Sequence, residues 1–148
     1  MRNPLSAHHS VRRLALSPEI LSRLQPRPGK THFPVRAILF EKTPETNWRV
    51  PWHQDVAIAV DRRIETPGFE GWSVKEGVPH VIPPGEILAG MVTLRIHLDA
   101  CDASNGALKV IPGSHVSGKL STDQEAKFIK ESTPTICAAA RGDAFLMK

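Results

Sequence analysis

The spacing of apolar positions changes near residue 32, from that of an amphipathic helix to the alternation of strands. Before this point, Ser17 and Pro18 form a favourable N-cap and first turn. The apolar residues that follow them lie on one face of a short helix that ends before Pro26. After it, HFPVRAILFEK (residues 32–42) predicts a strand rich in β-branched and aromatic residues. The pattern therefore predicts a helical lead followed by strands.

Further strands are predicted where apolar and polar residues alternate between turn-forming residues. These strands lie within residues 49–60, 91–99, 105–115, 135–140 and 143–148. Residues 61–90 are rich in proline and glycine, which predicts a long excursion of the kind that covers or lines a site. Thr122 and Glu125 have the spacing of a capping box, which predicts a helix through about Lys130.

This set of short strands and two helices predicts a mainly β fold with peripheral helices, an antiparallel sandwich or barrel. The composition agrees, because ten glycines and thirteen prolines in 148 residues are too many for a helical bundle. The final stretch, DAFLMK, is strand-like, so we expect an open sheet edge through which a homodimer can form. No run approaches the roughly eighteen apolar residues of a membrane span, and we expect a cytoplasmic protein without a membrane partner.

The net charge of +4 is concentrated at the start of the chain, where residues 1–36 hold seven Lys and Arg and one acid, Glu19. Such an arm can attract nucleic-acid phosphates. These arginines are scattered and no aromatic residues interleave with them, so we expect a solvated helix rather than nucleic-acid binding. Cys101 and Cys137 have no CxxC spacing, and we expect both to be reduced thiols.

The best candidate for chemistry is Trp52-His53-Gln54-Asp55. On an extended chain, residues i and i+2 project to the same face about 6.5 to 7 Å apart, so His53 and Asp55 can reach one metal ion while Gln54 turns away. An imidazole nitrogen and a carboxylate oxygen suit Fe(II), Mn(II) or Zn(II), and a second histidine would complete a facial triad. By itself, the HxD spacing is more often a surface or core-edge pair.

In its motifs the sequence resembles the phytanoyl-CoA dioxygenase (PhyH) family of Fe(II)- and 2-oxoglutarate-dependent oxygenases. The resemblance rests on the order PWHQD, then HLDACDASNGALKVIPGSH, then RGDAFLM. It implies a double-stranded β-helix (jelly roll, cupin-like) over residues 32–148, incomplete at the C-terminus and carrying the 61–90 insertion, after a basic helical lead-in at residues 1–31. It also implies His53 and Asp55 as iron ligands and 2-oxoglutarate as cosubstrate. The implied reaction hydroxylates a small organic substrate, with succinate and CO2 as co-products.

Other residues are candidates for the surroundings of the iron. A cation that points into a barrel needs an anionic partner, which a carboxylate of 2-oxoglutarate or of a substrate can supply. The candidates are Lys42, Thr93 and Arg95 for the cosubstrate, Trp52, Trp72 and His97 for the substrate wall, and Asn105, Gly106 and His115 for structural roles or contacts to the metal ligands. Asn105-Gly106 is first of all a turn-forming pair.

Two hypotheses of different classes follow from the resemblance. In the family, a second histidine ligand and an arginine for the far carboxylate of 2-oxoglutarate lie beyond the position equivalent to Lys148. None of the other histidines of the sequence occupies the matching place. The first hypothesis is an oxygenase whose chain is recorded short. The second is a catalytically inactive remnant or binding module of the same fold, without the distal histidine and the cosubstrate arginine.

Overall fold

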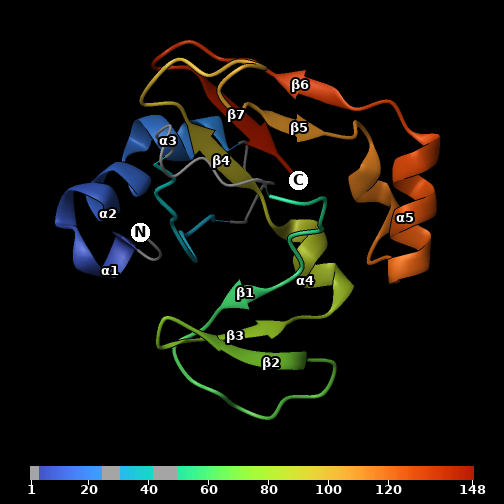
Figure 1. Cartoon of the computed structure of the whole chain (residues 1–148). Coiled ribbons are helices and arrows are strands. Elements are labelled where there is room, and N and C mark those ends of the chain that lie inside the picture. The colour runs from blue at the N-terminus through green and yellow to red at the C-terminus, as the bar shows by residue number, and fades with distance from the viewer. Residues whose placement is uncertain (1–3, 25–30, 42–49) are drawn as a thin grey trace. The chain divides into compact units, whose positions relative to one another are not determined.

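The computed structural model describes residues 4–24, 31–41 and 50–148 (Figure 1). The chain forms two compact units. The first comprises Met1–Thr46 and Val56–Pro84, and the second comprises Asn47–Asp55 and Gly85–Lys148. The segment that carries the HxD pair therefore belongs to the same unit as the C-terminal part of the chain.

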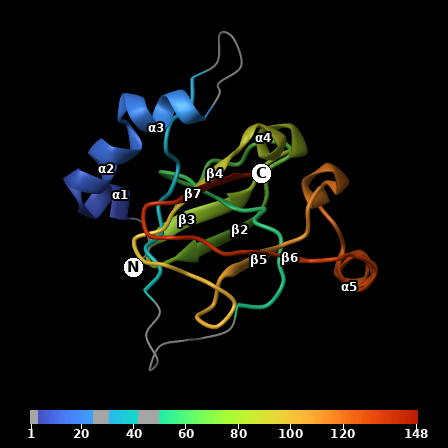
Figure 2. The same cartoon turned by 90° about the horizontal axis from the view of Figure 1, so that it is seen from above.

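The first unit begins with three short helices, α1 (Pro4–Ala7), α2 (His9–Ala15) and α3 (Pro18–Arg23), which follow one another along the chain (Figure 2). The helix predicted from Ser17 and Pro18 is confirmed as α3. The Ser17 side chain accepts a hydrogen bond from Ile20 N at 3.4 Å, and Pro18 occupies the first turn. This cap satisfies an N–H that has no partner inside the helix.

A three-stranded antiparallel sheet of order β1-β3-β2 also belongs to the first unit. Its strands are β1 (Ile58–Ala59), β2 (Glu70–Lys75) and β3 (Val78–Ile82). Val81 of the central strand is fully buried, with 0% of its surface exposed. The best-shielded apolar side chain of the described residues thus lies on β3.

Residues 61–90 contain regular structure that the sequence interpretation missed. β2 and β3 form a hairpin whose turn residues, Glu76 and Gly77, have φ of 51° and 78°. Positive φ at both central residues is typical of a type I′ turn, which matches the twist of the two strands. Pro79 has no N–H, but it remains in the sheet because its carbonyl accepts a hydrogen bond from Val60 N at 3.0 Å.

Two strands predicted earlier in the chain are shorter than expected. Among residues 31–41, only Ile38 makes a β-bridge, so the strand predicted at 32–42 is wrong for the described residues. Pro34 explains part of the difference, because it cannot donate to a ladder and restricts the residue before it. Of the strand predicted within 49–60, only β1 forms.

The second unit holds most of the predicted C-terminal strands. Its elements are α4 (Gly85–Gly90), β4 (Thr93–Ile96), β5 (Leu108–Val110), the 3-10 helix η2 (Ser114–Ser117), α5 (Thr122–Glu131), β6 (Thr135–Cys137) and β7 (Ala144–Met147). β4 pairs with β7 and β5 with β6, both antiparallel (Figure 2). Each of these strands lies inside a stretch where the alternation predicts one.

The helix α5 begins one residue earlier than the capping-box spacing of Thr122 and Glu125 predicts. Its N-cap is Ser121, whose hydroxyl accepts a hydrogen bond from Gln124 N at 3.4 Å while Ser121 N donates to Gln124 Oε1 at 2.9 Å. This register leaves Asp123 and Glu125 in the first turn. Negative charge there is favourable because the N-terminal end of a helix is electropositive.

Within the described residues, the fold consists of several short antiparallel strands with few helices, as the sequence predicts for a mainly β protein. None of the described helices combines the length and the apolar content required to cross a bilayer.

Candidate metal centre

The segment that carries the HxD pair belongs to no helix or strand. Residues 50–55 make no backbone–backbone hydrogen bond within the described chain. Pro51 contributes to this, because it has no N–H to donate. The segment is held by side-chain hydrogen bonds of Gln54 and His53, in place of a β ladder.

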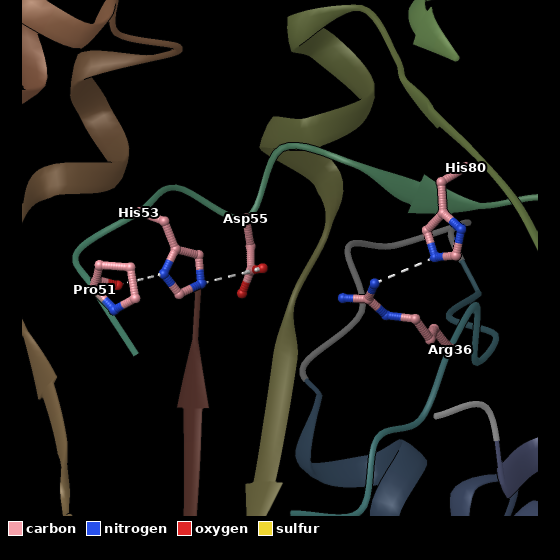
Figure 3. A network of polar contacts seen from close by, with 5 residues as sticks. All are labelled: Arg36, Pro51, His53, Asp55 and His80. Carbon is pink, nitrogen blue, oxygen red and sulfur yellow. Dashed lines mark hydrogen bonds and ion pairs between the residues drawn. The ribbon is translucent and has the colours of Figure 1, made fainter. Parts of the chain in front are cut away.

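His53 and Asp55 point toward one another. His53 Nε2 lies 3.8 Å from Asp55 Oδ1, and His53 Nδ1 lies 2.8 Å from the carbonyl oxygen of Pro51 (Figure 3). Because a carbonyl only accepts, Nδ1 must carry the proton of this hydrogen bond. In the neutral ring, Nε2 therefore presents its lone pair on the side of the carboxylate. The co-facing geometry predicted from the i, i+2 spacing is confirmed.

This arrangement fits a divalent transition metal. Imidazole nitrogen and carboxylate oxygen bind such ions at about 2.0 to 2.2 Å, so two donors 3.8 Å apart can share one ion. A ligating histidine commonly donates its other N–H to a backbone carbonyl, which is the role that Pro51 has here. The side chains of His53 and Asp55 are 54% and 74% exposed, so an ion can reach them from solvent. Among the described residues, no third His, Cys, Asp or Glu joins them in a metal-binding group.

The side chain between the two candidate ligands is anchored to a distant part of the chain. Gln54 Nε2 donates to the carbonyl oxygen of Gly118 at 2.7 Å, and Gln54 Oε1 accepts from Leu120 N at 2.8 Å. Gln54 is thus bound to the backbone of residues 118–120. Its partners could not be predicted from the residue types, because both are backbone groups.

Two of the residues predicted for the cosubstrate lie on β4. Thr93 is exposed and Arg95 is half-buried, and their register partners on β7 are Met147 and Phe145. The third predicted residue, Lys42, lies outside the described residues.

His97, predicted for the substrate wall, is one of the best-buried polar side chains of the described residues, at 6% exposure. Its ring meets Phe145 edge to face, with centroids 5.3 Å apart and planes at 82°. Its Nε2 atom is buried and has no hydrogen-bond partner within the described chain. An unpaired buried nitrogen is costly, which distinguishes His97 from an ordinary core residue.

The two tryptophans predicted for the substrate wall lie in different units. Trp52 is 38% exposed and precedes His53 in the second unit. Trp72 is part of β2 in the first unit, where the guanidinium carbon of Arg63 lies 5.4 Å from the ring centroid. Arg63 also forms an ion pair with Glu65 at 2.6 Å. Trp72 thus makes a cation–π contact with Arg63, a residue of the same unit.

Asn105 and Gly106 lie in the tight turn before β5. Gly106 has a φ of 88°, and Asn105 Oδ1 accepts from Asp102 N at 2.7 Å. In the same turn, the Ser104 hydroxyl and the Ser104 N–H both donate to Asp102 Oδ1, and these bonds hold the pKa of the Asp102 carboxyl below its usual range. His115, the remaining predicted residue, is exposed in η2.

A second histidine contact, missed by the sequence interpretation, occurs in the first unit. His80 of β3 is 3% exposed, and its Nδ1 donates to the carbonyl oxygen of Val78 at 2.9 Å. Its Nε2 lies 3.4 Å from Arg36 Nη1, which can only donate (Figure 3). Both nitrogens of this buried ring are therefore paired, and Arg36 has a structural partner.

A shallow pocket of about 410 Å³ lies elsewhere in the second unit, lined by residues 100–102, 138–140 and 143. None of the residues predicted for the metal or the cosubstrate lines it. The candidate centre is instead the exposed face that bears His53 and Asp55.

These features define a class: an antiparallel β protein with an exposed imidazole–carboxylate pair suited to a divalent transition metal. The family model described as Phytanoyl-CoA dioxygenase (PhyH) matches residues 2–148. The chain therefore belongs to the phytanoyl-CoA dioxygenase (PhyH) family, whose members depend on Fe(II) and 2-oxoglutarate. Searches of curated proteins and of solved structures found no match to the chain.

Proposed function

We propose that this protein is an Fe(II)- and 2-oxoglutarate-dependent dioxygenase that hydroxylates a small organic substrate and forms succinate and CO2. The observation that carries the proposal is the 3.8 Å separation of His53 Nε2 and Asp55 Oδ1, with Nδ1 tied to Pro51. Membership of the family supports Fe(II) as the metal and 2-oxoglutarate as the cosubstrate. The fold that we propose for its strands is the double-stranded β-helix of this family.

In this proposal, His53 Nε2 and Asp55 Oδ1 hold the iron, and the Pro51 carbonyl keeps the ring proton on Nδ1 so that Nε2 stays available. Bound iron supplies the oxidising chemistry, in which O2 is consumed and 2-oxoglutarate is decarboxylated. We assign Thr93 and Arg95 of β4 to the cosubstrate, because a half-buried guanidinium can pair with a carboxylate.

A second candidate function is a metal-binding module without turnover. It is favoured by the absence of a third His, Cys, Asp or Glu beside His53 and Asp55 among the described residues. Three protein ligands are the usual set for a non-haem iron oxygenase.

One experiment separates the two functions. The full chain is titrated with Mn(II) and, separately, incubated with Fe(II), 2-oxoglutarate and O2 while succinate is measured. Succinate formation that His53→Ala abolishes supports the oxygenase. Mn(II) binding that requires His53 without succinate supports the binding module. The matched control is His9→Ala, at an exposed histidine of α2, which should behave as the wild type. Mn(II) binding that is unaffected by His53→Ala would refute both functions.

A further inference from the structure

The side chain of Gln54 joins two segments that are far apart in the sequence. Its amide donates to Gly118 O at 2.7 Å and accepts from Leu120 N at 2.8 Å, across 64 and 66 residues of chain. The two bonds flank Lys119, so the Gln54 amide pairs with this segment as a neighbouring β-strand would. We call this pair of hydrogen bonds the Gln54 clamp. It needs a donor and an acceptor on one planar group.

The chemical requirements of this clamp are narrow. Glutamine offers an N–H donor and a carbonyl acceptor, whereas glutamate at neutral pH offers acceptors only and would face the Gly118 carbonyl with a second oxygen. Asparagine has the same groups on a shorter side chain. The clamp therefore depends on this residue type at this position rather than on polarity alone.

The clamp acts on the residue between the two candidate ligands. Gln54 lies between His53 and Asp55 in the chain, so fixing its side chain on the 118–120 backbone restrains the backbone from which both candidate ligands project. Residues 50–55 have no backbone–backbone hydrogen bonds within the described chain that could do this instead. Apart from the bond of His53 Nδ1 to Pro51 O, the Gln54 amide supplies the hydrogen bonds that hold this segment within the described chain.

The segment that receives the clamp is itself well defined. It lies between η2, which ends at Ser117, and the N-cap of α5 at Ser121, whose capping box fixes the start of the helix. Gly118 has a φ of 65°, a conformation that favours glycine and turns its carbonyl into a position where Gln54 can reach it. The anchor is therefore a helix start and a turn, both set by local sequence.

We propose that Gln54 is a positioning residue for the metal centre: by clamping the 118–120 backbone, it holds His53 and Asp55 in the arrangement that binds one divalent ion. The proposal rests on the proposed function, since it assigns the pair to a metal. It adds a residue that would touch neither the metal nor the substrate. Groups that orient metal ligands are typically worth about 10- to 100-fold in metal affinity.

The test replaces Gln54 by methionine, which has a similar length and no charge, and measures the Mn(II) dissociation constant of the full chain by equilibrium dialysis. We expect the constant to rise about 10- to 100-fold in Gln54→Met. Two readouts need no metal. The Leu120 amide should exchange its hydrogen faster with solvent, and nitrogen NMR of the neutral His53 ring should show a mixture of tautomers where the wild type has the Nδ1–H form.

The matched control is Lys127→Met, at an exposed lysine of α5, which leaves both the capping box and the Gln54 bonds intact. It should keep the wild-type Mn(II) constant and the wild-type His53 tautomer. Leu120→Pro removes the backbone N–H that donates to Gln54 Oε1. It should reproduce the Gln54→Met result, so the test does not rest on the folding of one variant. Equal losses in Gln54→Met and Lys127→Met would overturn the proposal, as would a faster Leu120 exchange with an unchanged Mn(II) constant and tautomer.

The two proposals fail differently. Wild-type Mn(II) binding that does not need His53 would refute the metal centre, and the tautomer of His53 would then decide alone whether Gln54 positions it. Binding that needs His53 but not Gln54 would leave the metal centre standing and overturn the positioning role.

Discussion

His53 Nε2 lies 3.8 Å from Asp55 Oδ1, while the opposite nitrogen of the same ring lies 2.8 Å from the carbonyl oxygen of Pro51. One ring nitrogen is thus occupied and the other faces a carboxylate. A metal ion bound at this second nitrogen would have the Asp55 carboxylate as its next ligand.

The carboxylate of this pair should be required for metal binding. Asp55→Asn keeps the size of the side chain but removes its charge, so we expect the Mn(II) dissociation constant to rise at least about tenfold at neutral pH. Equilibrium dialysis measures the constant, and Asp61→Asn, at an exposed aspartate, is the control. An unchanged constant in Asp55→Asn would exclude this carboxylate from the centre.

The β2–β3 turn offers a test of the fold. Glu76 has a φ of 51°, which an L-residue other than Asn, Asp or Gly adopts at a cost of about 1 kcal/mol or more. Because type I′ turns favour Asn-Gly, we expect Glu76→Asn to raise the free energy of unfolding by about 0.5 to 1 kcal/mol in urea denaturation. Gly77→Ala should lower it through φ alone, since a Cβ there meets nothing within 4 Å. A loss of stability in Glu76→Asn would contradict the turn assignment.

The same turn shows where the sequence was a sufficient guide to the fold and where it was not. The signals for α3 and the C-terminal strands are local: a serine cap before a proline, and alternation over a few residues. The hairpin at β2 and β3 lacks such a signal, because Glu-Gly is not a typical hairpin turn and Pro79 suggests an interruption. Its pairing is decided by contacts across the sheet.

The candidate site divides in the same way. The proximity of the His53 and Asp55 side chains could be predicted from their i, i+2 spacing. The partners of Gln54 could not, because Gly118 O and Leu120 N are backbone groups 64 and 66 residues away and leave no mark in the residue types. The tie between His53 and Pro51 is equally invisible in the sequence, since any residue has a carbonyl.

The turn before β5 should make stability depend on pH. Donation by the Ser104 hydroxyl is the main cause that lowers the pKa of Asp102, followed by the Ser104 N–H. A lowered folded-state pKa stabilises the fold above the ordinary carboxyl pKa of about 3.9 and loses this contribution as pH falls through the folded value. Ser104→Ala should therefore raise the pKa of Asp102 and lower stability at neutral pH but not in acid.

Carboxyl-carbon NMR titration of Asp102, with urea denaturation at neutral and acidic pH, checks both parts of this prediction. Ser117→Ala, at an exposed serine of η2, should change neither quantity. A stability loss in Ser104→Ala that persists unchanged at low pH would show that the hydroxyl acts on the turn without the carboxylate.

The buried imidazole of His97 should make the protein less stable than an apolar ring at the same position would. It is 6% exposed, its Nε2 has no hydrogen-bond partner within the described chain, and its edge-to-face contact with Phe145 has a centroid distance of 5.3 Å. An unpaired buried nitrogen costs about 1–3 kcal/mol, whereas an aromatic contact contributes about 0.5–1.5 kcal/mol and survives in His97→Phe. We therefore expect His97→Phe to raise the free energy of unfolding by about 1 kcal/mol in urea denaturation, and Phe145→Leu, which removes the ring contact and some apolar volume, to lower it. A less stable His97→Phe variant would mean that Nε2 is hydrogen-bonded in solution.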